Sequence, residues 1–318
     1  MDAARSALVT GASSGIGAAT ARRLDELGFT VYGAARRTDR VSELAGDAVR
    51  PLMMDVTDDD SLVAGVRQIV EETGRVDVLV NNAGYGSYGA LEDVPLAEAR
   101  RQFEVNVFGA VRLIQLVLPH MRAQRSGTIV NVSSMGGRIY TPLGGWYHGT
   151  KHALEGISDC LRLETRPFGI DVVIVEPGSI ATDWGQIAGD ALRATSGDGP
   201  YAGQAGQMVK TLTTRSGRES SPEVVADAVA RAVSSRRPKT RYVVGYGARP
   251  LMTARRLLSD RMFDRIITRP ATSPTEVPEG AAHPRGIPEV SPSARGPKIR
   301  RSDSSIGTSL MLASRRAM

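Results

Sequence analysis

The sequence predicts an α/β protein built on a doubly wound parallel sheet. Apolar, β-branched segments alternate with amphipathic segments of helical period through about residue 250. Several apolar segments, such as Val172-Val173-Ile174-Val175, lack polar alternation, which is typical of strands buried on both faces. Strands that alternate with helices pair in parallel through right-handed crossovers, so one sheet with helices on both faces follows.

The alternation places strands and helices in a definite order. We expect strands at Ala7–Thr10, Thr30–Ala35, Arg50–Val56, Val76–Val80, Thr128–Val132, Asp171–Val175 and Arg241–Gly245. We expect helices at Gly15–Leu27, Asp58–Glu72, Phe103–Met121, Trp146–Arg166 and Pro222–Ser234. Ligands of such sheets bind beyond the carboxyl ends of the strands, so the residues that follow each strand are the candidates for function.

Two regions interrupt this alternation. Residues 184–220 are rich in Gly, Thr, Ser and Gln and are interpreted as a mobile insertion that covers the substrate. Residues 271–318 contain six prolines between positions 274 and 297, together with Ser and Arg, and show almost no periodicity. We therefore expect a single catalytic domain over residues 1–270 and a disordered tail over residues 271–318.

The composition favours a folded protein without a metal. Of the 318 residues 41% are hydrophobic, which excludes disorder over the whole chain, and no apolar run reaches the ~18 residues that a membrane-spanning helix needs. The first strand begins too close to Met1 for a signal peptide, so a cytoplasmic location is expected. One cysteine, Cys160, excludes an internal disulfide, and the four scattered histidines predict no metal site.

The net charge of +6 does not point to a nucleic-acid partner. Residues 271–318 hold seven Lys or Arg and four Asp or Glu, so half of the net charge lies outside the expected domain. Of the 40 basic residues 36 are arginines, a bias typical of coding composition, and no basic stripe interleaved with aromatic residues occurs. We expect no nucleic acid among the ligands.

A glycine-rich loop, Thr10-Gly11-Ala12-Ser13-Ser14-Gly15-Ile16-Gly17, joins the first strand to the first helix. Its spacing is G-x-x-x-G-x-G and differs from the common dinucleotide fingerprint G-x-G-x-x-G. Glycines let the backbone approach a pyrophosphate closely, and the helix N-terminus offers it free N–H groups. A plain strand–helix turn is the alternative, but the position in the chain favours a phosphate site.

Two arginines, Arg36 and Arg37, follow the second strand. In a dinucleotide-binding sheet an acidic residue at this place binds the ribose 2′-hydroxyl of NAD, whereas an arginine accommodates the 2′-phosphate of NADP. Ala35 occupies the strand end, and Asp39 lies farther into the loop. The sequence therefore favours NADP(H); the alternative is a solvated basic turn.

Tyr147 and Lys151 are four residues apart near the start of an expected helix, so they share one face. A phenol has an ordinary pKa near 10 and is a poor base at neutral pH, but a nearby ammonium group lowers that pKa. The pair can then exchange a proton with an alcohol or carbonyl oxygen. The alternative is a surface Tyr–Lys pair on an amphipathic helix.

Other polar residues lie close to the same predicted sheet edge. Ser133 and Ser134 follow the strand at Thr128–Val132, where a hydroxyl can bind a substrate oxygen. No G-x-S-x-G motif surrounds them, which disfavours nucleophilic serine chemistry. Asn106 lies among apolar residues of the helix expected at Phe103–Met121, where it could hold a water, kink the helix or act only structurally.

Together these motifs resemble the short-chain dehydrogenase/reductase family, a single-domain Rossmann-type fold, over about residues 5–250. Thr10–Gly17 resembles its TGxxxGxG cofactor loop, and Asn81-Asn82-Ala83-Gly84 its NNAG turn. The resemblance implies that the residues binding the cofactor are Gly11, Ser13, Ser14, Gly15, Ile16, Gly17, Arg36, Arg37, Asp55, Val56, Asn82, Ala83, Gly84, Tyr147, Lys151, Pro177, Gly178 and Thr182. It implies a catalytic tetrad of Asn106, Ser134, Tyr147 and Lys151, while the tail beyond about residue 270 is not explained by it.

The resemblance implies how these residues act. Tyr147 is the general acid or base at the substrate oxygen, and Lys151 lowers its pKa and binds the nicotinamide ribose. Ser134 positions the substrate oxygen, and Asn106 supports a water-linked proton relay. Hydride passes between the nicotinamide of NADP(H) and the substrate carbon.

The substrate is less sharply defined. Gly136, Gly137, Tyr140, Leu143, Trp146 and Tyr85 are expected to line the open side of the site, which favours a hydrophobic ketone or secondary alcohol. The segment Thr182-Asp183-Trp184 resembles hydroxysteroid- and retinol-type members of the family. The alternatives are a catalytically silent NADP(H)-binding regulatory or scaffold protein, and an epimerase or dehydratase with a retained cofactor.

The two longest expected helices carry more apolar surface than packing on one side requires. The residues concerned are Val111, Ile114, Leu118, Leu154, Ile157 and Leu161. Because the resembled family often assembles through these helices, we expect a homodimer or homotetramer.

Overall fold

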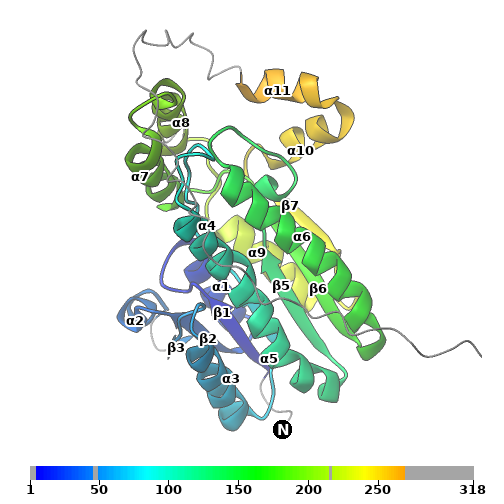
Figure 1. The fold of residues 1–318 in the computed structure, drawn as a ribbon. Helices are drawn as coiled ribbons and strands as arrows, with labels where there is room; N and C mark the ends of the chain where they lie inside the picture. The colour runs from blue at the N-terminus through cyan, green and yellow to red at the C-terminus, as the bar shows by residue number, and fades with distance from the viewer. Residues whose placement is uncertain (1–4, 46–48, 215–216, 269–318) are drawn as a thin grey trace, which may run out of the picture. The chain divides into compact units, whose positions relative to one another are not determined.

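The computed structural model describes residues 5–45, 49–214 and 217–268 and contains the parallel sheet that the sequence predicts (Figure 1). Its strands are β1 (Ser6–Thr10), β2 (Thr30–Ala35), β3 (Val49–Met53), β4 (Val78–Asn81), β5 (Gly127–Val132), β6 (Ile170–Pro177) and β7 (Arg241–Val244). They pair in the order β3-β2-β1-β4-β5-β6-β7, every pair parallel. The chain reverses its direction of winding between β1 and β4, which is where doubly wound sheets bind ligands.

Two apolar layers hold the sheet between helices. Along β1, Ala7 and Val9 belong to one core cluster and Leu8 to the other, as expected where successive side chains point to opposite faces. The first cluster includes side chains of α1 (Gly15–Asp25), α2 (Thr38–Ala45) and α9 (Glu223–Ser234). The second includes side chains of α3 (Asp59–Thr73), α5 (Gly109–Gln124) and α6 (Gly145–Thr165).

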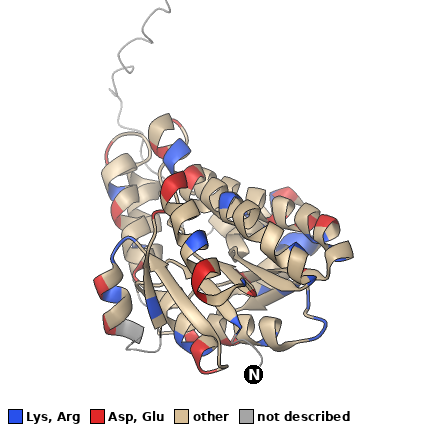
Figure 2. Cartoon of the chain, turned by 90° about the horizontal axis from the view of Figure 1, so that it is seen from below, with Lys and Arg blue, Asp and Glu red and all other residues tan. Residues whose placement is uncertain are grey.

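Charged residues lie mainly on the helices and loops around the sheet. Figure 2 shows acidic and basic segments interspersed there, while most of the sheet carries other residues. No helix within the described ranges is long and apolar enough to cross a membrane. The same ranges contain no cluster of His, Cys, Asp or Glu that could hold a metal ion.

The helix expected at Phe103–Met121 is wrong in its start and its continuity. The structure has α4 (Leu96–Phe103), a π-helical turn η2 (Glu104–Phe108) and then α5. Asn106 lies in the π-helical turn and is buried, so the polar residue that looked out of place marks a local change of helix type.

Several helices were not expected at all. Arg36 and Arg37 precede α2, and Asp39, expected in a loop, lies in its first turn. Residues 184–220, which were interpreted as a mobile insertion, contain α7 (Trp184–Ser196) and α8 (Ala202–Thr213). Two further helices, α10 (Ala248–Leu257) and α11 (Asp260–Thr268), follow β7. The disordered tail expected at residues 271–318 lies outside the described residues.

Glycines explain why the α7–α8 pair was misinterpreted. A Cβ at Gly185 would collide with the carbonyl oxygen of Leu212, and a Cβ at Gly189 would press on the side chain of Thr213. These glycines, which resemble loop residues in the sequence, allow two helices to pack closely. Ala188 and Ala205, both fully buried, lie in the same core cluster.

A buried ion cluster joins β6, β7, α6 and the turn after β5. Arg241 donates from Nη2 to Glu155 Oε2 at 3.0 Å and to Asp159 Oδ2 at 2.7 Å. Arg138 donates from Nε to Glu176 Oε1 at 3.2 Å and pairs with Glu155 Oε2 at 3.2 Å. Glu176 is 0% and Glu155 4% exposed, so these two arginines compensate carboxylates that have lost their water.

Arg241→Gln should therefore lower the free energy of unfolding by about 3 kcal/mol, because it leaves Glu155 and Glu176 buried with one cation fewer. Urea unfolding measures this change. Arg67→Gln is the matched control, because the ion pair of Arg67 with Glu71 is exposed to solvent. Its loss should lower the free energy of unfolding by about 0.5 kcal/mol or less. Equal effects of the two substitutions would contradict the structural role of the cluster.

Candidate active site

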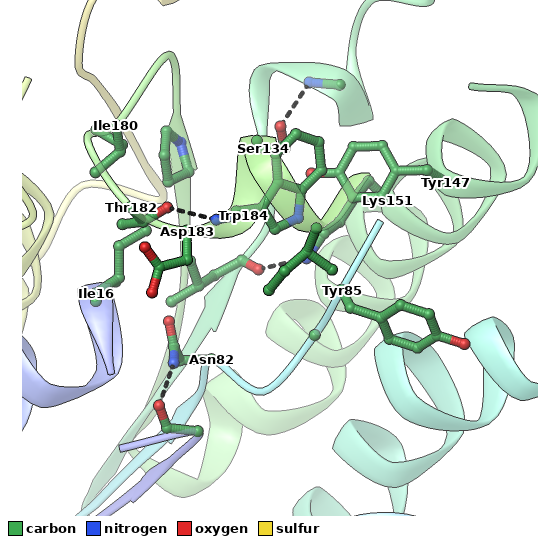
Figure 3. A pocket seen from close by; sticks show the side chains of 18 of the residues that line it. Ile16, Asn82, Tyr85, Ser134, Tyr147, Lys151, Ile180, Thr182, Asp183 and Trp184 are labelled. Atoms are coloured by element: carbon green, nitrogen blue, oxygen red, sulfur yellow. Dashed lines mark hydrogen bonds between the residues drawn. The ribbon is translucent and has the colours of Figure 1, made fainter. Parts of the chain in front are cut away.

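A cavity of about 1340 Å³ lies at the carboxyl edge of the sheet, and Figure 3 shows its central part. It is lined by the ends of β1, β2, β4, β5 and β6 and by residues of the later helices. Of the residues expected at the site, the lining includes Gly11, Ser13, Ser14, Gly15, Ile16, Gly17, Arg36, Arg37, Asp55, Val56, Asn82, Ala83, Gly84, Ser134, Tyr147, Lys151, Pro177, Gly178 and Thr182. Among the residues expected to be catalytic or to bind the cofactor, Asn106 is the one that does not line the cavity.

Thr10 ties the glycine-rich loop to the turn after β4. Its Oγ1 accepts the backbone N–H groups of Asn82 and Ala83, each at 3.0 Å. Asn82 Nδ2 in turn donates to the Thr10 carbonyl at 2.9 Å. These bonds therefore hold the glycine-rich loop after β1 and the turn after β4 together, at the point where the winding of the sheet reverses.

The loop fits a pyrophosphate group. Gly11 and Gly15 have φ of +68° and +49°, and a Cβ at Gly17 would collide with the Gly11 carbonyl oxygen. Ser14 caps α1 without a side-chain hydrogen bond, so the first N–H groups of the helix stay available to an anion. These residues could hold the diphosphate of a dinucleotide.

Three arginines line the cavity, two directly after β2 and one on α4. Arg36 and Arg37 line the cavity and are exposed. The pKa of Asp55 is lowered, chiefly because its carboxylate accepts the Thr57 N–H, and the charges of Arg36 and Arg101 add to the effect. Arg101 lines the cavity from α4 and was missed, because nothing in the sequence connects that helix to the site.

Tyr147 and Ser134 both line the cavity and are hydrogen-bonded to each other through their side chains. Ser134 begins the 3₁₀ turn η3 (Met135–Gly137), and its Oγ accepts the N–H of Gly136 at 3.0 Å. Burial raises the pKa of Tyr147 to about 12, and a hydrogen bond with the Ser134 side chain opposes this rise. Burial is the larger of these two influences on the pKa of Tyr147.

Lys151 is buried one helical turn beyond Tyr147. Its Nζ donates to the carbonyl oxygen of Val132 at 3.0 Å. Burial lowers the pKa of Lys151 to about 8, while the negative charge of Glu155 acts in the opposite direction. A Cβ at Gly84 would lie 3.7 Å from this Nζ, so the glycine keeps open the space beside the ammonium group.

Asn106 has protein partners for its whole side chain. Its Oδ1 accepts the Tyr85 N–H at 3.0 Å, and its Nδ2 donates to the Tyr85 carbonyl at 2.9 Å and to Thr150 Oγ1 at 3.1 Å. Thr150 is the residue before Lys151. Asn106 therefore holds the chain at Tyr85 against α6, as expected of a residue with a structural role.

Aromatic rings enclose the Tyr147 phenol, and the sequence indicated only part of this enclosure. Trp184, Tyr88 and His148 have ring centroids 5.1, 5.8 and 5.7 Å from that of Tyr147. His148 Nε2 accepts the Thr141 N–H at 3.0 Å and its Nδ1 lies 2.9 Å from the Gly136 carbonyl, so the neutral Nδ1–H tautomer fits. Tyr88 and His148 follow no motif and were missed.

Of the residues expected on the open side of the site, Tyr85 and Gly136 line the cavity and the other four do not. Gly137, Tyr140, Leu143 and Trp146 do not line the cavity. Tyr140 instead donates to Asp264 of α11 at 2.9 Å, and Trp146 packs on Phe103. Both rings hold neighbouring elements together, a function that their spacing in the sequence does not reveal.

The fold and the site define a dinucleotide-binding protein of the doubly wound class, and comparison with known proteins identifies its family. The family model of the short chain dehydrogenases matches residues 5–191. The chain therefore belongs to the short-chain dehydrogenase/reductase family and is an oxidoreductase of that family.

Individual relatives agree with this assignment. A 3-ketodihydrosphingosine reductase of Bacteroides thetaiotaomicron is 40% identical over 238 residues, 75% of this chain and 87% of that protein. An NADPH-dependent 3-dehydrocapnine reductase of Ornithobacterium rhinotracheale is 35% identical over 277 residues, 82% of this chain and 95% of that protein. The crystal structure of a short-chain dehydrogenase from Streptomyces avermitilis is 36% identical, covers 80% of this chain and 92% of its own, and superposes with a TM-score of 0.71.

The buried lysine makes stability depend on pH. Unfolded Lys151 keeps its proton up to about pH 10.5, whereas the folded side chain releases it near pH 8. Between these values the unfolded state binds more protons, so the free energy of unfolding should rise with pH, by about 1–2 kcal/mol from pH 7.5 to 9.5. Urea unfolding at both pH values should show this rise in the wild type and in Lys210→Met, at an exposed lysine, but not in Lys151→Met. A rise that survives in Lys151→Met would contradict the assignment.

Proposed function

We propose that this chain is an NADP(H)-dependent reductase that acts on a ketone carried by a long hydrocarbon chain, with Tyr147 as the general acid. The observation that carries the proposal is the extension of the cavity beyond Tyr147. Helices α7, α8, α10 and α11 contribute seven apolar side chains to the lining, against the polar Gln186, Gln207, Thr211 and Thr213: Trp184 and Ile187 of α7, Met208 and Leu212 of α8, Leu251 of α10, and Ile266 and Ile267 of α11. A short polar metabolite would leave this surface uncovered.

The proton chemistry follows from Tyr147 and Ser134. With a pKa near 12 the phenol keeps its proton at neutral pH and can give it to a ketone oxygen as negative charge develops there. Ser134 Oγ accepts the Gly136 N–H, and its hydroxyl, which hydrogen-bonds to Tyr147 in the free site, would donate to the substrate oxygen once that oxygen lies between the two side chains. When bound, the nicotinamide supplies the hydride for the carbonyl carbon.

Lys151 and the residues around it hold the reacting groups in place. Its ammonium is fixed by the Val132 carbonyl and lies beside the space that Gly84 leaves open. That position suits a hydrogen bond to a ribose hydroxyl. The aromatic rings of Trp184 and Tyr88 exclude water from the phenol, which strengthens its hydrogen bond to the substrate oxygen.

The relatives support the same substrate class. The names of the two reductases both place the reduced group at position 3 of the substrate, and one of these enzymes is named as NADPH-dependent. 3-Ketodihydrosphingosine is a long-chain amino ketone. An apolar cavity lined by four helices would accept the hydrocarbon part of such a molecule.

The test is a series of ketones of increasing chain length, followed by NADPH absorbance. We expect kcat/KM to rise by up to about fourfold per methylene, at ~0.8 kcal/mol for each buried group, until the cavity is filled. Tyr147→Phe should lower kcat by about 10²–10⁴-fold and leave NADPH affinity nearly unchanged. NADPH binding without turnover of any ketone would instead favour the silent regulatory protein. Turnover without net NADPH consumption would favour an epimerase or dehydratase.

The proposed cofactor preference depends on Arg36. A guanidinium bound to a 2′-phosphate contributes roughly 1.5–3 kcal/mol, so Arg36→Ala should weaken NADPH binding by about 10- to 150-fold. Adding Ala35→Asp should reverse the preference toward NADH, because a carboxylate binds the free 2′-hydroxyl and repels phosphate. Arg40→Ala, at an exposed position of α2 outside the cavity lining, is the control. Equal use of NADH and NADPH by the wild type would refute this role for Arg36.

We also propose a homodimer or homotetramer formed through α5 and α6. Of the residues that suggested excess apolar surface, Ile114, Leu154 and Leu161 are buried in the protomer, while Ile157 is 36% exposed. Phe108 and Leu163, at 54% and 67% exposed, extend the apolar surface on the same two-helix region. These side chains are the candidates for an interface.

A further inference from the structure

Helices α10 and α11 bring exposed apolar side chains to one end of the molecule. Leu257, Met262 and Ile266 are 76%, 50% and 40% exposed. Figure 1 shows α10 and α11 at the same end of the sheet as α7 and α8, the helices that line the substrate part of the cavity. The exposed residues therefore lie on the side from which a substrate would enter.

Internal contacts fix the orientation of α11. Phe263 is fully buried and packs against Tyr140 with ring centroids 5.5 Å apart, and Tyr140 donates to Asp264 at 2.9 Å. Met262 and Ile266, four residues apart, lie on one side of the same helix. Phe263 thus packs inside the protein, whereas Met262 and Ile266 of the same helix are exposed to solvent.

Basic residues accompany the exposed apolar ones. Residues 248–268 contain five arginines and two aspartates, a net charge of +3 in 21 residues. Both aspartates are engaged: Asp260 pairs with Arg255 at 2.9 Å, and Asp264 accepts from Tyr140. Arg256, Arg261 and Arg265 are exposed beside Leu257, Met262 and Ile266 in the sequence.

The same helix reaches the cavity. Ile266 and Ile267 line it from α11, and Ile187, 54% exposed, lines it from α7. An apolar rim that is open to solvent and continuous with an apolar cavity is a route for a hydrocarbon chain.

We propose that Leu257, Met262 and Ile266, together with Arg256, Arg261 and Arg265, form a surface that binds an anionic lipid bilayer and through which a membrane-dissolved substrate enters the cavity. Apolar side chains flanked by arginines are the pattern of helices that lie in a membrane interface. Each arginine near an anionic surface contributes about fivefold to the affinity. The identity of the entering molecule rests on the proposed function, whereas the binding of lipid does not.

The test is flotation of the full chain with vesicles of phosphatidylcholine alone or mixed with phosphatidylglycerol. We expect binding to the anionic vesicles, weakened by salt. The double variants Leu257→Ser with Met262→Ser, and Arg261→Gln with Arg265→Gln, should each bind at least tenfold more weakly. Leu96→Ser with Met53→Ser is the matched control, since these side chains are 57% and 62% exposed on other elements and should leave binding unchanged.

A second measurement separates this inference from the proposed function. None of the four substituted positions at 257, 261, 262 and 265 lines the cavity, so NADPH oxidation with a short, water-soluble ketone should be unchanged, while turnover of a vesicle-borne ketone should fall. Absence of vesicle binding by the wild type, or equal binding by the variants, would overturn the lipid surface whatever the activity. A concentration-dependent dimer that Met262→Ser abolishes would assign the surface to a second copy of the chain and would also overturn it.

Discussion

The site depends on charged and polar groups being held out of water at the carboxyl edge of a parallel sheet. Lys151 is 7% exposed, Glu155 4% and Glu176 0%, and none of these groups would stay there without compensation. Arg138 and Arg241 neutralise the two carboxylates, and they do so from the turn that carries Ser134 and from the last strand. The ion cluster and the reacting residues are therefore parts of one packed region, in which Glu155 also opposes the lowering of the Lys151 pKa.

Burial also affects the protonation state of Tyr147, because it raises the pKa of the phenol. A phenol whose pKa is raised to about 12 is protonated throughout the neutral range, so it is prepared to donate a proton rather than to accept one. Lys151, with a pKa lowered to about 8, changes charge much closer to neutrality. In the proposed mechanism the protonated phenol is the proton donor for ketone reduction, and the same oxygen takes the proton back in the reverse reaction.

The sequence predicted the parts of the site that follow strands and failed where tertiary packing decides. Gly17 and the turn at Asn82 were recognisable because backbone geometry requires those residues beside a phosphate, and both line the cavity. The helices α7 and α8 were not, because Gly185 and Gly189 have the composition of a loop although they serve close helix packing. The binding of Tyr140 to Asp264 joins residues 124 positions apart, and no local pattern carries that information.

The residues after the strands and the later helices line different parts of the cavity, and this separation bears on substrate specificity. The doubly wound frame supplies the glycine-rich loop, Ser134, Tyr147 and Lys151 from strand ends and the helices that follow them, so the chemistry is fixed by the sheet. The proposed substrate part of the cavity is lined by α7, α8, α10 and α11, which add no strand to the sheet, and α7 and α8 share a separate core cluster with Tyr88, Leu143 and Tyr147. On the proposed function, substitutions in those helices should therefore alter substrate preference more than proton transfer by Tyr147. In this chain, Ile187 and Ile266 combine both properties, since they line the cavity and are 54% and 40% exposed at its rim.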